Sequence, residues 1–184
     1  MLLEISLKNF FSIKDEITLD LRAGRINTTN SRNLKSNTFN FEKQKILKSA
    51  AIYGANASGK SNIVRAIRFC CAMIFNSHNH NENDNFYFQP YKFDGFPNKP
   101  SEFSIRFVVN NIEYKYFFGL TTKRIIKESL YYYPNGRKDK VFERDNNQGK
   151  SKREKYTFAS GVIKRPFDVA ENTSDKTLYI SRAS

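Results

Sequence analysis

The chain has 184 residues, which is enough for one domain with a hydrophobic core and too few for two ordinary domains. Hydrophobic residues at 39% and charged residues at 27% exclude a wholly disordered chain. No apolar run approaches the roughly 20 residues that cross a bilayer, so we expect no membrane span. The net charge of +13 is suited to phosphate-rich partners, although a composition rich in lysine and asparagine explains it equally well.

The N-terminal segment is predicted to form two strands joined by a turn. Apolar and polar residues alternate from Leu3 to Leu7 and again from Ile17 to Leu21, which indicates one buried face. The first ten residues include Glu4 and several polar residues where a signal peptide needs an apolar region, so we expect a cytoplasmic protein. Residues 23–45 lack a sustained period and are expected to form a long surface loop, with one short strand near Phe39.

A strand, a glycine loop and a helix are predicted next. The apolar run Ala50–Tyr53 is typical of a buried strand, and it ends at Gly54. From Ser61 the apolar residues follow a helical period, with Ile63, Ile67, Cys70 and Ile74 in one row. This pattern predicts a mostly buried helix, whose narrower polar side carries Arg65 and Arg68 and whose two cysteines, Cys70 and Cys71, are core thiols.

The second half is predicted to be an antiparallel meander. Alternating runs at residues 103–109 and 112–118 flank the turn Asn110–Asn111, and two further strands follow around residues 125–144. Such strands should split Tyr131, Tyr132 and Tyr133 between the two faces of a sheet. We therefore expect one α/β lobe of α+β character over 1–184, divided into strands, loop and helix (1–75), a loop region (76–101), the meander (102–145), and a basic loop with a C-terminal strand (146–184).

One motif identifies a ligand. The residues from Gly54 to Ser61 match the phosphate-loop pattern G-x-x-x-x-G-K-[ST] in full. In such a loop backbone N–H groups cradle phosphates at a helix N-terminus, the lysine bridges the β- and γ-phosphates, and the serine hydroxyl binds Mg²⁺. The predicted nucleotide-binding residues are Gly54, Ala55, Asn56, Ala57, Ser58, Gly59, Lys60, Ser61 and Asn62, with Ser61 as the Mg²⁺ ligand. The base-reading motif of small GTPases is missing from the sequence, so ATP is favoured.

The N-terminal strand, "KNFFS" at residues 8–12, a second strand and "IYGANASGKSN" together resemble the RecF and structural-maintenance-of-chromosomes branch of ABC-type ATPases. More closely they resemble bacterial AAA-type proteins allied to overcoming-lysogenization-defect nucleases and other phage-defence ATPases. The resemblance implies a P-loop lobe of ABC-ATPase type, ATP and Mg²⁺ as ligands, roles in DNA transactions or phage defence, and head-to-head dimers that sandwich two nucleotides.

The resemblance also assigns roles to single residues. The family's frequent N-F-[RK]-S has Phe11 at its basic position, and Lys8 or Lys14 could supply the charge instead. Gln89 is a candidate for the glutamine that contacts Mg²⁺ and the attacking water; the alternative is an ordinary loop residue before Pro90.

Other motifs of the family are not found in this sequence. It has no apolar strand ending in Asp or Asp-Glu, no Ser-Gly-Gly signature and no later switch histidine. We therefore expect that hydrolysis needs further motifs, supplied by a second half or a partner, and that the 184 residues alone turn over ATP weakly if at all. The alternative is a non-catalytic nucleic-acid or protein-binding module with a vestigial phosphate loop; a small-molecule kinase fits less well.

Two polar segments have a plain interpretation and a functional one. His78 and His80 have a spacing that metals can use, but a solvated loop after the helix is favoured. The basic segment 149–156 could bind a nucleic-acid backbone through Lys150, Lys152, Arg153 and Lys155, and a solvated loop is the competing interpretation.

Overall fold

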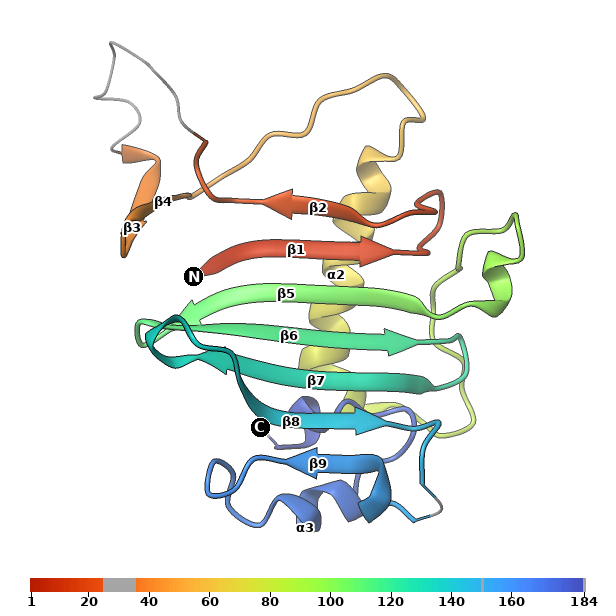
Figure 1. The fold of residues 1–184 in the computed structure, drawn as a ribbon. Helices are drawn as coiled ribbons and strands as arrows, with labels where there is room; N and C mark the ends of the chain where they lie inside the picture. Colours follow the sequence, from red (N-terminus) through yellow and green to blue (C-terminus); the bar gives the residue numbers. More distant parts are fainter. Residues whose placement is uncertain (25–35, 150, 184) are drawn as a thin grey trace.

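The computed structural model describes residues 1–24, 36–149 and 151–183, and a seven-stranded sheet dominates it (Figure 1). The strands run in the order β2-β1-β5-β6-β7-β8-β9, and every neighbouring pair is antiparallel. Their bounds are β1 (Leu2–Lys8), β2 (Ile17–Asp20), β5 (Ser101–Val109), β6 (Ile112–Leu120), β7 (Ile125–Tyr133), β8 (Asp139–Asp145) and β9 (Tyr156–Phe158). The predicted N-terminal hairpin and the predicted meander are thus confirmed.

A separate two-stranded hairpin, β3 (Thr38–Phe41) and β4 (Gln44–Leu47), stands beside the end of the sheet (Figure 1). It has its own small core, in which Phe41 and Ile46 pack against Leu3 and Val108. The predicted strand near Phe39 exists, but it pairs with a second strand that the sequence did not indicate. Residues 25–35 of the predicted loop lie outside the described residues.

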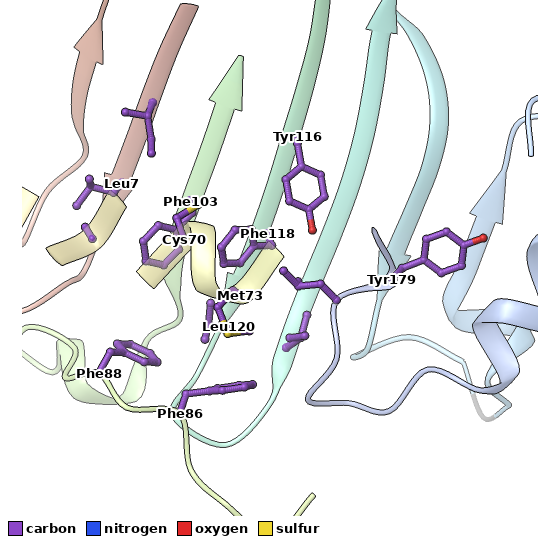
Figure 2. Packing of buried hydrophobic residues seen from close by; sticks show 14 of the residues in the cluster. Leu7, Cys70, Met73, Phe86, Phe88, Phe103, Tyr116, Phe118, Leu120 and Tyr179 are labelled. Atoms are coloured by element: carbon purple, nitrogen blue, oxygen red, sulfur yellow. The ribbon is translucent and has the colours of Figure 1, made fainter. Parts of the chain in front are cut away.

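Helix α2 (Lys60–Asn76) crosses one face of the sheet (Figure 1). Cys70 and Met73 on this helix face Phe103, Phe118 and Leu120 on the strands, and these residues form the centre of the main core (Figure 2). The alternation of apolar residues along β5 and β6 provides the strands' side of this contact.

The helix is less buried than its pattern predicted. Only Ala66, Cys70 and Met73 are buried, whereas Val64 is 61% exposed and Phe75 is 70% exposed. Cys71 is exposed, so the prediction of two core thiols is wrong for Cys71 and correct for Cys70. The reason is that the sheet packs against one side of α2, whereas the side that carries Val64 and Phe75 faces solvent.

Short helices and turns complete the fold. They are η1 (Ser77–Asn79), η2 (Phe96–Asn98), η3 (Pro134–Gly136), η4 (Arg153–Lys155), α3 (Pro166–Glu171) and α4 (Tyr179–Ala183). The range 146–184, predicted to hold a basic loop and a C-terminal strand, contains the short strand β9, whereas its last described residues, Tyr179–Ala183, form helix α4. Its backbone N–H groups at Tyr179 and Ile180 donate to the buried carboxylate of Glu128, which favours a helix start there over a strand.

Candidate functional site: a phosphate loop at the start of helix α2

The predicted phosphate loop lies immediately before α2, at the end of the long connection from β4 (Figure 1). The residues before it, Ala50–Tyr53, do not form the predicted buried strand. They have no strand partner among the described residues, and Tyr53 is 90% exposed. An apolar run becomes a strand only where a neighbour pairs with its backbone, so the local pattern alone did not decide this structure.

Gly59 starts the helix in a conformation that favours glycine. It is the N-cap of α2 with φ 90° and ψ 3°, in the left-handed region. A Cβ at Gly59 would also lie 3.1 Å from the hydroxyl oxygen of Ser12, and a Cβ at Gly54 would lie 3.0 Å from that of Ser58. The two fixed glycines of the motif therefore form a glycine cradle, in which the backbone lies closer to Ser12 and Ser58 than a side chain at either position would allow.

The side chain of Lys60 folds back over this loop. Its ammonium donates hydrogen bonds to the carbonyl oxygens of Gly54, at 2.8 Å, and Ala55, and to the hydroxyl of Ser58 at 3.3 Å. These acceptors are neutral oxygens, and phosphate oxygens would replace them as stronger, charged partners. Lys60 is thus placed where the motif requires its charge.

The electrostatics of the helix start also suit an anion. The first turn of α2 contains no acidic side chain, so the partial positive charge of the helix N-terminus is not neutralised there. Ser61 is exposed and follows Lys60 directly, so its hydroxyl is available to a metal ion that accompanies phosphates. The loop, its lysine and this hydroxyl fit a Mg²⁺-nucleotide, since the loop lies at a helix N-terminus and carries one cation and one exposed hydroxyl.

The turn Phe10–Ile13 supports the loop from the N-terminal strand. Asn62 donates from its side-chain amide to the hydroxyl oxygen of Ser12 over 2.7 Å. Phe11 has φ 50°, an unfavourable conformation for a bulky residue that costs about 1–3 kcal/mol. Two backbone hydrogen bonds between Phe10 and Ile13, at 2.8 and 2.9 Å, hold the turn in this conformation.

The structure brings Gln89 close to the loop. Its carbonyl oxygen accepts a hydrogen bond from the N–H of Phe11 at 2.8 Å, and Gln89, Ser12 and Asn62 line the same cavity. The candidate glutamine is therefore beside the predicted site, although this placement does not assign its role.

The two lysines considered as substitutes for a basic residue at position 11 lie elsewhere. Lys14 pairs with Asp94 at 2.7 Å, and this bond raises the pKa of Lys14. Lys8 lies with Glu16 and Glu102 in a cavity on the polar face of the sheet. Arg65 does lie against Phe11, with its guanidinium 5.8 Å from the ring centre. The sequence could have indicated Arg65, because it lies one helical turn after Asn62 on the same side of α2.

The histidines and the basic segment have ordinary surroundings. His78 makes a 3.0 Å contact with Ser181, and the ring of His80 packs against Phe86 at 5.3 Å. The described residues contain no cluster of ligands that could hold a metal ion. Lys152 and Arg153 are exposed, whereas Lys155 is partly buried. Arg153 and Lys155 belong to η4, where they pair with Glu171 and Asp175, and Lys150 lies outside the described residues.

No helix in the described part of the chain is both long enough and apolar enough to cross a membrane.

Tyr132 packs against the main core, whereas Tyr131 and Tyr133 are on the opposite face, so the predicted split of the three tyrosines is confirmed.

Comparison with known proteins supports the phosphate loop. A family model described as "AAA domain, putative AbiEii toxin, Type IV TA system" matches residues 49–167, which include the whole loop, α2 and the meander. No curated protein matches the chain. The family match spans more than half of the chain and agrees with the motif, the glycine cradle and the position of Lys60. The chain belongs to this family of AAA domains.

Proposed function

We propose that the chain is the ATP-binding lobe of a RecF-like or SMC-like member of the AAA and ABC-type ATPases. The single observation that carries the proposal is the Gly54–Asn62 loop at the start of α2, with the Lys60 ammonium held against the loop carbonyls. In this proposal the loop N–H groups and Lys60 bind the β- and γ-phosphates, and Ser61 binds the accompanying Mg²⁺. The bound ion supplies charge neutralisation at the phosphates.

Hydrolysis is proposed to need groups from outside the 184 residues. In the described part of the chain, the side chains that hydrogen-bond in the loop or to Asn62 are those of Lys60, Ser58, Ser12 and Arg65, and none of them is a carboxylate that could complete the ion's coordination. The exposed apolar side chains beside the loop support the same idea. Tyr53 and Val64 are 90% and 61% exposed, so a further polypeptide would bury them.

The covering polypeptide is proposed to be a second half of the ATPase or a partner chain that carries the acidic strand and the signature motif. In a head-to-head dimer, each lobe would bind nucleotide against the other. The biological setting proposed is a DNA transaction or phage defence.

Equilibrium titration with Mg-ATP tests the first part of the proposal. The wild type is expected to bind, and Lys60→Ala to bind at least tenfold more weakly, because a charge-assisted contact to phosphate is lost. Lys48→Ala is the matched control, because it removes an exposed lysine that lies over the Phe39 ring rather than in the loop. Equal affinities of wild type and Lys60→Ala would refute nucleotide binding through this loop.

Steady-state turnover tests the second part. The isolated chain should release phosphate from ATP no faster than Lys60→Ala does. Turnover by the wild type that Lys60→Ala abolishes would show that the 184 residues are catalytically sufficient.

A second candidate function, nucleic-acid binding, is favoured by one cluster of lysines. Lys123, Lys152, Lys155 and Lys176 come from three separate segments and surround one cavity of about 400 Å³. Glu82 and Asp175 also line it, so the local excess is two positive charges. Such a cluster can bind a nucleic-acid backbone, because each lysine ammonium attracts a phosphate as a point charge.

Salt-dependent retention of a short DNA duplex separates the two functions. If the lysine cluster binds DNA, Lys123→Ala combined with Lys152→Ala should weaken retention and reduce its salt dependence, while leaving Mg-ATP affinity unchanged. Absence of retention at low salt would remove this candidate.

A further inference from the structure

A cavity of about 350 Å³ opens beside the first turns of α2. Phe11, Ser12, Asn62, Arg65, Gln89 and Phe93 line it. The cavity adjoins the phosphate loop, because Asn62 follows Ser61 directly and the Ser12 hydroxyl lies against Gly59. From Ser61 to Arg65 the helix rises only about 6 Å, a shorter span than one nucleoside triphosphate.

Two aromatic side chains that line the cavity, Phe93 and Phe11, differ in how firmly they are held. Phe93 is 66% exposed, and its ring meets Tyr91 edge-on at 5.5 Å. Phe11 is fixed instead, because the turn holds its backbone at φ 50° and its ring packs edge-on against Phe10 at 4.8 Å. Unfavourable backbone conformations are concentrated at functional sites, so the conformation of Phe11 points to a role of its ring in ligand binding.

The polar groups of the cavity match the edge of a nucleobase. The side-chain amide of Gln89 is exposed, and no hydrogen-bond partner for it is found among the described residues. The backbone of Gln89 is held in place by the bond from Phe11. A free carboxamide offers one donor side and one acceptor side, the pattern that pairs with N6 and N7 of adenine.

Arg65 adds a flat cation to the same wall. Its guanidinium lies 5.8 Å from the centre of the Phe11 ring and 3.3 Å from the side-chain oxygen of Asn62. Guanidinium planes and aromatic rings are the groups on which nucleobases stack. The cavity therefore has groups on which a base can stack and a side-chain amide without a partner among the described residues, and it lies about one helical turn from the phosphate loop.

We propose that this cavity receives the adenine base of the nucleotide, with Phe11 and Arg65 as stacking groups and Gln89 as the group that reads the base edge. This inference rests on the proposed binding of the phosphates by Gly54–Asn62. It gives Gln89 a contact to the base, in place of the contact to Mg²⁺ and water that the family resemblance implied.

The experiment compares two probes, Mg-ATP and Mg-tripolyphosphate, in equilibrium titrations. Tripolyphosphate has the phosphates without the base, so it reports the loop alone. The variants are Phe11→Ala, Gln89→Ala and Lys60→Ala. Phe39→Ala is the matched control, because Phe39 is 51% exposed and also lies under a lysine, 4.8 Å away, but is in strand β3.

The variants are expected to change the affinities for the two probes differently. Wild type should bind Mg-ATP more tightly than Mg-tripolyphosphate, and Phe11→Ala should lower ATP affinity about tenfold while tripolyphosphate affinity stays constant. Gln89→Ala should reduce the preference for ATP over GTP, and it keeps the proposal testable if Phe11→Ala does not fold, since Gln89 is exposed. Phe39→Ala should match wild type with both probes.

Two outcomes would overturn the proposal and remain distinguishable from failure of the loop. If Phe11→Ala and Gln89→Ala bind Mg-ATP as wild type does while Lys60→Ala does not, the loop binds phosphate and the base lies elsewhere. If Phe11→Ala weakens both probes equally, Phe11 supports the loop and does not contact the base. Failure of wild type to bind either probe would instead refute the proposed function itself.

Discussion

Arg144 and Glu128 form an ion pair inside the protein: Nη1 of the arginine lies 3.6 Å from Oε2 of the glutamate, and both side chains are essentially inaccessible to solvent. Burial raises the pKa of Glu128, and the Arg144 charge opposes that rise. Arg144 also donates to the carbonyl oxygens of Thr177 and Ser174, at 2.7 and 2.8 Å. Through these bonds and those that Glu128 accepts from the N–H groups of Tyr179 and Ile180, the pair attaches the C-terminal segment to the sheet.

Removing one partner of this pair should destabilise the fold strongly. Glu128→Ala leaves Arg144 charged and buried, so we expect the free energy of unfolding to fall by about 3–5 kcal/mol. Lys127→Ala is the control, because Lys127 pairs with Asp145 at 3.3 Å on the surface and such pairs contribute about 0–1 kcal/mol. Urea unfolding followed by circular dichroism measures both; equal losses would contradict an anchoring role for the buried pair.

Glu143 should make stability depend on pH in the acid range. Hydrogen bonds from the Tyr131 hydroxyl and the Lys140 ammonium lower its pKa below the ordinary 4.5. A carboxyl with a lowered folded-state pKa stabilises the fold fully above its unfolded value and loses that contribution as the pH falls through the folded value.

The stability difference between wild type and Glu143→Gln should therefore be largest near neutral pH and shrink as the pH falls below 4.5. Urea unfolding at a series of pH values measures it. A difference that grows on acidification would contradict the hydrogen-bonded arrangement of Tyr131, Lys140 and Glu143.

Gly59→Ala should damage the loop more than an equivalent change elsewhere. Its φ of 90° costs an alanine about 1–2 kcal/mol, and the new Cβ would press on Ser12. Gly161→Ala is the matched control, with φ 75° and nothing within 4 Å of the added Cβ. Both should lose stability in thermal unfolding, whereas only Gly59→Ala should also lose Mg-ATP affinity in titration. Unchanged affinity in Gly59→Ala would refute the close fit around the loop.

The two adjacent cysteines should react differently. Cys71 is exposed, whereas Cys70 is buried and its burial raises the pKa of the thiol. Because the thiolate is the reactive form, a colourimetric disulfide reagent should modify one thiol per native chain and two in denaturant. Cys71→Ser should abolish the native reaction. If Cys70→Ser abolishes it instead, α2 is rotated relative to the arrangement described.

The sequence predicted the sheet well because its strands alternate cleanly. In β5, Phe103, Ile105 and Phe107 alternate with polar residues and belong to the core that packs against α2. The pair Asn110–Asn111 adopts the positive φ values, 50° and 60°, that a tight hairpin turn requires. Such local signals determine a hairpin without reference to distant residues. The same holds for Gly54–Ser61, where the motif fixes both the loop and the start of the helix.

The errors arose where structure depends on distant partners. Ala50–Tyr53 has the composition of a strand but lacks a neighbouring strand, and α4 begins where the carboxylate of Glu128, some fifty residues earlier, accepts its N–H groups. Arg65 was assigned only to the polar side of a helix, because its proximity to Phe11 depends on the packing of the N-terminal turn against α2. Periodicity within one segment carries no information about these contacts.

The most direct test of the central claim, that the Gly54–Asn62 loop binds ATP phosphates, is amide hydrogen exchange of this loop with and without Mg-ATP. The loop is largely exposed, so its amides should exchange quickly in the free protein. Saturating Mg-ATP should slow exchange across residues 54–62 in wild type and leave it unchanged in Lys60→Ala. Binding of Mg-ATP by wild type with no protection of residues 54–62 would contradict the account, because the phosphates would then lie outside the loop.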